Sequence, residues 1–101
     1  SLEAEGANGE LVTPPLKPRG SELMMNADAS GGALEVEVLE AASGRCLDGG
    51  DVEAFDGFNG NQLRGAVSWQ GRRLGEVAGG REIRLRVQLS GETQLYSLWC
   101  Q

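Results

Sequence analysis

The stretch from residue 33 to residue 40, ALEVEVLE, carries the clearest structural pattern in the chain. From position 34 to position 38, leucine or valine alternates with glutamate. Successive side chains of an extended strand point to opposite faces, so a period of two predicts a strand with one buried face and one solvated face. The predicted fold is built outward from this strand.

A second alternation of the same kind spans residues 81–89, REIRLRVQL. The turn signal SGE follows at 90–92, and the strand-forming segment TQLYSLWC follows at 93–100. Together they predict two antiparallel strands joined by a short hairpin turn.

The solvated faces of the two alternating segments carry opposite charges. One presents Glu35 and Glu37, and the other presents Arg84 and Arg86. If the segments are neighbours, these side chains face each other across the strands. Such exposed pairs contribute only about 0.2–1 kcal/mol each, but they help to fix the register.

The remaining segments are short and separated by turn residues. ELVT at 10–13 and GAVSWQG at 65–71 have the composition of strands, and DASGG at 28–32 and ASGR at 42–45 have that of turns. No helix longer than one turn is expected. This pattern predicts an all-β fold, a single antiparallel, jelly-roll-like β-sandwich of about six to eight short strands.

Length and charge narrow the functional classes. The 101 residues suit one domain, with a flexible lead-in at 1–8 and the β-sandwich module at 9–101. The net charge of −6 repels phosphate backbones and anionic lipids, so neither nucleic acid nor a membrane is an expected partner. Histidine is absent, which excludes Ser-His-Asp and Cys-His nucleophile pairs. Most of the 15 carboxylates lie on solvated strand faces or in turns, without a cleft to form a glycosidase pair, so we do not expect an enzyme.

Four phrases in sequence resemble a known accessory domain: GELVTPPL at 9–16, GSELMMNADASGGALEVEVLE at 20–40, VSWQG at 67–71 and LYSLW at 95–99. The domain is the C-terminal β-sandwich of bacterial secreted glycoside hydrolases and related propeller-type carbohydrate enzymes. The resemblance implies a secreted, non-catalytic carbohydrate-binding module, linked covalently to a catalytic domain, with a polysaccharide or oligosaccharide as ligand. The alternative is a structural β-sandwich that stabilises the catalytic domain without binding free glycan.

The segment EAFDGFNGNQ, residues 53–62, has three interpretations. It is a lid, if Phe55 and Phe58 plug one end of the sandwich. It binds calcium as a cofactor, if carboxylates converge on an ion; the candidate ligands are Asp48, Asp51 and Asp56. It binds sugar, if Phe58 stacks beside hydrogen-bonding side chains; these are Asp56, Asn59, Asn61 and Gln62.

Three other aromatic residues are candidate platforms for a sugar ring, because a flat apolar ring stacks on sugar C–H groups for about 1 kcal/mol. Trp69 and Trp99 end two different strands, and each is alternatively a core residue. Tyr96 is expected to be the more exposed ring. A basic stripe either pairs with glutamates or binds an acidic sugar, because guanidinium matches carboxylate and sulfate geometry. Its residues are Arg72, Arg73, Arg81, Arg84 and Arg86, and Arg84 and Arg86 are its candidate ligand-binding residues.

Cys46 and Cys100 are the two cysteines of the chain. In an exported module they could form one disulfide, which would stabilise the fold by about 4 kcal/mol in the chain-entropy view. The alternative is two separate thiols buried as small apolar groups.

Overall fold

The computed structural model describes residues 2–4, 9–18, 22–58 and 60–100. Two strands of 18 residues each dominate it, β3 (Leu23–Glu40) and β5 (Ile83–Cys100). They run antiparallel over their whole length, from Leu23 opposite Cys100 to Glu40 opposite Ile83. The all-β class with an antiparallel sheet is therefore confirmed.

Three shorter strands complete the described sheet. β4 (Asn61–Val67) pairs with the first part of β3, and β1 (Leu2–Ala4) and β2 (Gly9–Val12) pair with β5. The described residues thus form one five-stranded sheet in the order β1-β5-β3-β4, with β2 also on β5. This differs from the predicted six to eight short strands, because two strands are far longer than expected. Residues 2–4 of the predicted lead-in are also in a strand.

The hairpin predicted at 90–92 is wrong, and so is the turn predicted at 28–32. Both segments lie inside continuous strands, and Gly32 is paired with Gly91 across β3 and β5. A Cβ atom on Gly32 would lie 1.9 Å from the Ser90 carbonyl oxygen, and Gly91 has φ 67°. The glycines therefore mark a bend at which two backbones approach closely.

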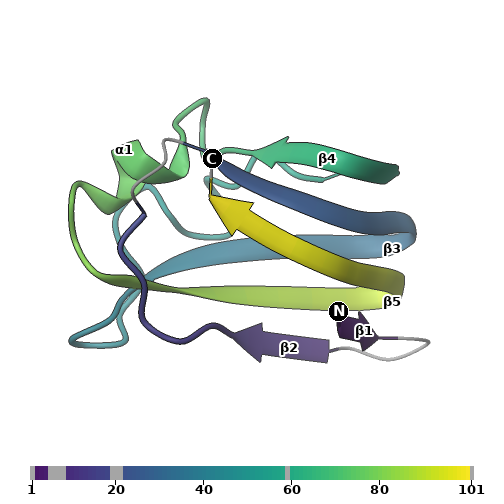
Figure 1. The fold of residues 1–101 in the computed structure, drawn as a ribbon, viewed down its shortest axis with the longest axis horizontal. Coiled ribbons are helices and arrows are strands. Elements are labelled where there is room, and N and C mark those ends of the chain that lie inside the picture. The colour runs from purple at the N-terminus through teal and green to yellow at the C-terminus, as the bar shows by residue number, and fades with distance from the viewer. Residues whose placement is uncertain (1, 5–8, 19–21, 59, 101) are drawn as a thin grey trace.

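Figure 1 shows the consequence: β3 and β5 curl back together at this bend, so the sheet has two halves. One half contains the start of β3, β4 and the end of β5, and the other contains the end of β3, the start of β5 and β2. A single buried cluster includes side chains of both halves, for example Met25 and Leu95 from the first and Val36 and Leu85 from the second.

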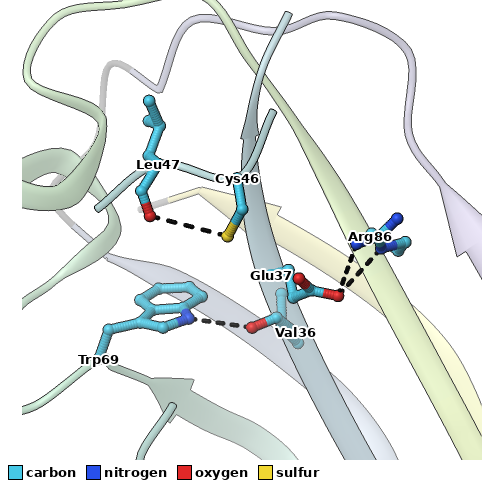
Figure 2. A network of polar contacts seen from close by, with 6 residues as sticks. All are labelled: Val36, Glu37, Cys46, Leu47, Trp69 and Arg86. Atoms are coloured by element: carbon cyan, nitrogen blue, oxygen red, sulfur yellow. Dashed lines mark hydrogen bonds and ion pairs between the residues drawn. The ribbon is translucent and has the colours of Figure 1, made fainter. Parts of the chain in front are cut away.

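The long segment between β3 and β4 lies along an edge of β3. Val38 donates its N–H to Gly50 (2.8 Å) and accepts from the N–H of Leu47 (2.9 Å). The indole N–H of Trp69 donates to the carbonyl of Val36 at 3.0 Å, as Figure 2 shows. The loop and the indole therefore satisfy backbone groups that a neighbouring strand would otherwise pair.

A short helix lies between β4 and β5, in agreement with the expectation of no helix longer than about one turn. Helix α1 (Leu74–Ala78) buries Leu74, Val77 and Ala78. It ends at Gly79, which has φ 60° and donates its N–H to Gly75. A glycine in this left-handed conformation is the usual way to terminate a helix.

Candidate functional site

The outer surface of the first half of the sheet carries the two aromatic side chains of β5. Leu23, Met25 and Ala27 of β3 belong to the core, so the alternation turns Met24 and Asn26 outward. The register places Trp99 and Ser97 of β5 on the same outer surface. We call this surface the aromatic face; its residues are Met24, Asn26, Tyr96, Ser97 and Trp99.

The aromatic face is built in two rows. Met24 lies opposite Trp99, and Asn26 lies opposite Ser97. The register shifts immediately after Asn26, which leaves Tyr96 as an extra residue of β5. Tyr96 is 36% exposed, Trp99 is half-buried, and Met24 is only 8% exposed. The tyrosine hydroxyl donates to the side-chain carbonyl of Gln94, which orients the ring.

Asn26 contributes the unusual polar feature of this face. Its Oδ1 atom is buried and has no hydrogen-bond partner. Every other buried side-chain nitrogen or oxygen in the described part of the chain has one. An unsatisfied buried acceptor costs about 1–3 kcal/mol.

The outer surface of the second half is ionic. Figure 2 shows Arg86 against Glu37, with Nη2 2.9 Å and Nε 3.0 Å from one carboxylate oxygen. This confirms the predicted cross-strand pair. Arg84 donates to the carbonyl of Thr13 at 3.3 Å, and Glu35 lies opposite Gln88 rather than opposite an arginine. We call this surface the ionic face; its residues are Glu35, Glu37, Arg84, Arg86 and Gln88.

Two of the predicted platform residues are core residues. Trp69 is fully buried, and its ring lies 5.8 Å from that of Phe55 at an interplanar angle of 52°. Phe58 is 6% exposed and packs over Gly65, where any Cβ would collide with its ring. Neither ring presents a face to solvent, because both fill the interior. Burial of Phe58, with Phe55 partly buried against the same cluster, agrees with the lid interpretation.

Asp56 organises the backbone of this lid. Its carboxylate accepts hydrogen bonds from the Ser68 hydroxyl (2.6 Å), the Gly71 N–H (2.8 Å) and the Gln70 N–H (3.1 Å). The Ser68 hydroxyl, followed by the two N–H groups, lowers the pKa of Asp56 below its ordinary value of 3.8. Both of its oxygens therefore accept hydrogen bonds from within the protein.

The three candidate calcium ligands are not assembled into a site. Asp51 accepts the N–H of Ala54 at 2.9 Å, which makes it a loop-capping residue. Within residues 2–4, 9–18, 22–58 and 60–100, no three His, Cys, Asp or Glu side chains are positioned to hold a metal ion. Asp48 and Asp56 therefore do not complete a coordination shell with Asp51.

The other polar residues of the predicted loop site are placed only in part. Gln62 is exposed on β4, where its backbone pairs with Ala27. Asn61 pairs with Asp28 through its backbone, and its side chain is not described. Asn59 lies outside the described residues.

The two cysteines are free, and both are exposed. The backbone of Cys46 pairs with that of Leu39 near the end of β3, whereas the backbone of Cys100 pairs with that of Leu23 at the start of β3. The two cysteines therefore do not form the predicted disulfide. Partial burial raises the pKa of both thiols, and the carboxylates of Glu37 and Asp51 raise that of Cys46 further. A raised pKa keeps a thiol protonated and therefore weakly nucleophilic.

Sequence reasoning missed three residues of the aromatic face: Met24, Asn26 and Ser97. The signal was present in LMMNADA at 23–29, where every second residue is leucine, methionine or alanine and the others become polar. Treating 28–32 as a turn hid this alternation, since it cut the strand short.

Comparison with known protein families, with curated proteins and with solved structures gives no match for this chain. In the part of the chain that the structure describes, no helix is long and apolar enough to cross a membrane. The fold and its exposed surfaces are therefore the basis for a functional proposal.

Proposed function

We propose that this chain is a non-catalytic module that binds carbohydrate through the aromatic face. The observation that carries the proposal is that the exposed ring of Tyr96 and the half-buried ring of Trp99 both lie near the end of β5, outside the buried core. Sugar rings stack on such rings through their C–H faces, and each ring contributes about 0.5–1.5 kcal/mol, by analogy with other aromatic contacts. Asn26 and Ser97 supply neighbouring hydrogen-bonding groups for the sugar hydroxyls.

The rival function is a structural module that packs against a catalytic domain. An interface of that kind would leave a contiguous apolar patch where the partner was removed. Among the described residues, the exposed large hydrophobic side chains are Val12 and Tyr96. They belong to different halves of the sheet, Val12 on β2 and Tyr96 on the aromatic face. Their separation favours ligand binding over an apolar packing role.

Affinity electrophoresis of the 101-residue chain through gels that contain a panel of polysaccharides tests the proposal. We expect at least one polysaccharide to retard the chain. Tyr96→Ala and Trp99→Ala should each weaken that retardation by roughly twofold to tenfold, as the loss of one stacking contact requires.

Val12→Ala is the matched control, because it removes the other exposed large hydrophobic side chain from the opposite half. It should leave the mobility unchanged. Retardation by no polysaccharide in the panel, or equal loss in the Val12 variant, would rule out binding through the aromatic face.

A further inference from the structure

A hollow of about 230 Å³ lies at the end of the sheet where β3 ends and β5 begins. Two arginines from different segments line it, Arg45 from the turn after β3 and Arg81 from the residues before β5. Ser43, Glu40 and Asp48 also line it. The hollow thus combines two cations with groups that bind hydroxyls.

Backbone hydrogen bonds hold the two segments together. Glu40 donates its N–H to Arg45 at 2.7 Å, and Gly44 donates its N–H to Glu40 at 2.7 Å. Ala41 donates its N–H to Glu82 at 3.1 Å, next to the pairing of Glu40 with Ile83. The backbone positions of both arginines are therefore fixed relative to each other before any ligand arrives.

Among the described residues, the ion pair found is that between Arg86 and Glu37. The guanidinium groups of Arg45 and Arg81 therefore have no ion-pair partner there. Both arginines are exposed. Arg84 and Arg86, which the sequence suggested for an acidic sugar, are instead held by Thr13 and Glu37. Arg45 and Arg81, by contrast, line one hollow from two different segments.

We propose that this hollow binds the carboxylate or sulfate group of an acidic sugar between Arg45 and Arg81. Guanidinium groups match the geometry of both anions. Glu40 and Asp48 offset the charge of the arginines, so the hollow disfavours a compact, highly charged anion without hydroxyls. Those carboxylates and the Ser43 hydroxyl accept hydrogen bonds from the hydroxyls of a sugar ring. The inference rests on the proposed function in taking carbohydrate as the ligand, and it adds the chemical class.

NMR titration of the whole chain tests the proposal with four probes: a tetragalacturonate, a sulfated galactose tetrasaccharide, a neutral galactose tetrasaccharide and inorganic sulfate. We expect at least one acidic oligosaccharide to shift the side-chain Nε–H signals of Arg45 and Arg81. R45Q/R81Q should weaken that binding at least tenfold and change binding of the neutral oligosaccharide less than twofold. Arg73→Gln removes the charge of an exposed arginine that does not line the hollow, and it should have less than a twofold effect.

Each alternative outcome separates the two proposals. If R45Q/R81Q does not distinguish acidic from neutral oligosaccharides, the acidic-sugar site is wrong while carbohydrate binding through the aromatic face stands. If inorganic sulfate binds as tightly as the acidic sugars, the hollow selects an anion and not a sugar. If Tyr96→Ala weakens binding of neither the acidic nor the neutral oligosaccharide while R45Q/R81Q loses the acidic one, the aromatic face is wrong and the hollow stands. If no oligosaccharide binds, both proposals fail.

Discussion

The aromatic face and the ionic face are formed by the same two strands, yet they use their polar groups in opposite ways. On the ionic face, Arg86 makes two contacts with the Glu37 carboxylate, so both groups are satisfied within the protein. On the aromatic face, Asn26 Oδ1 has no partner and Tyr96 is exposed. The charged groups of the ionic face are thus paired internally, whereas the aromatic face keeps one exposed ring and one buried acceptor without a partner.

The ionic face contributes chiefly to register. Glu37 lies directly opposite Arg86, and the valines on either side of Glu37 point into the core. A slip of one residue would turn those valines to solvent and place like charges or mismatched groups opposite each other. The aromatic face lacks such a pair among the described residues, and there the register shifts at Asn26.

The largest expected effect comes from destroying the bend that separates the two faces. Gly32→Ala places a Cβ 1.9 Å from the carbonyl oxygen of Ser90 and 2.6 Å from Oγ1 of Thr93. No side-chain rotation relieves a collision with backbone, so the two strands must separate there. We expect a loss comparable to the whole stability of a domain of this size, about 5–10 kcal/mol, seen as the absence of a cooperative melt by circular dichroism.

Gly44→Ala is the control for this substitution. Gly44 has φ 75°, but a Cβ there meets nothing within 4 Å. Left-handed strain alone should therefore cost about 1–2 kcal/mol and leave a cooperative melt. Equal effects at the two glycines would show that the close approach at Gly32 does not maintain the bend.

The next effect concerns the edge of the half that carries the ionic face. Trp69 is fully buried and donates to the carbonyl of Val36, so Trp69→Ala should cost about 3–5 kcal/mol in urea denaturation. Trp69→Phe keeps much of the ring volume but loses the N–H, leaving Val36 without its donor. It should cost less than the alanine variant, and a phenylalanine variant as stable as the wild type would mean that the indole N–H contributes nothing to this edge.

The sequence predicted the parts of the fold that depend on local alternation. The segments at 33–40 and 81–89 are strands with buried aliphatic side chains, and they are neighbours with Glu37 against Arg86. Period-two patterning and opposite charges are both visible in a single sequence, because they reflect which face of a strand is buried. Burial of Trp69 was one of two open alternatives, and the structure selects it.

The length of the strands could not be predicted from the same signals. Serine and glycine at 30–32 and at 90–91 are as typical of a turn as of a bend in a continuing strand. The distinction depends on Gly32 meeting Gly91, which lie far apart in the sequence and come together only when β3 pairs with β5. Local sequence patterns alone therefore predicted a turn in β3 and a hairpin in β5, where the structure has two continuous, bent strands.

The candidate site divides in the same way. Tyr96 and Trp99 could be chosen as aromatic residues at the end of a strand, and Tyr96 was correctly expected to be exposed. Asn26 joins them only through the pairing of β3 with β5. Arg45 and Arg81 likewise line one hollow because the turn after β3 is bonded to the segment before β5. No local sequence pattern predicts either the position of Asn26 beside the aromatic residues or that of Arg45 beside Arg81.

The smallest effect is expected at the pair that defines the ionic face, and it sharpens the contrast with the aromatic face most directly. A double-mutant cycle of Glu37→Gln with Arg86→Met should give a coupling free energy of about 1 kcal/mol. That value lies at the upper end for exposed pairs, because the Glu37 side chain is only 12% exposed while Arg86 is 34% exposed.

Glu35→Gln combined with Arg86→Met is the matched cycle: Glu35 lies on the same strand and face but opposite Gln88, so its coupling should be near zero. The measurement is urea denaturation at low and high salt, and the Glu37 coupling should fall only partly at high salt, since a largely buried carboxylate is poorly screened. Equal coupling for the two glutamates would mean that the arginine responds to the general negative charge of β3, in which case the ionic face would no longer explain the register.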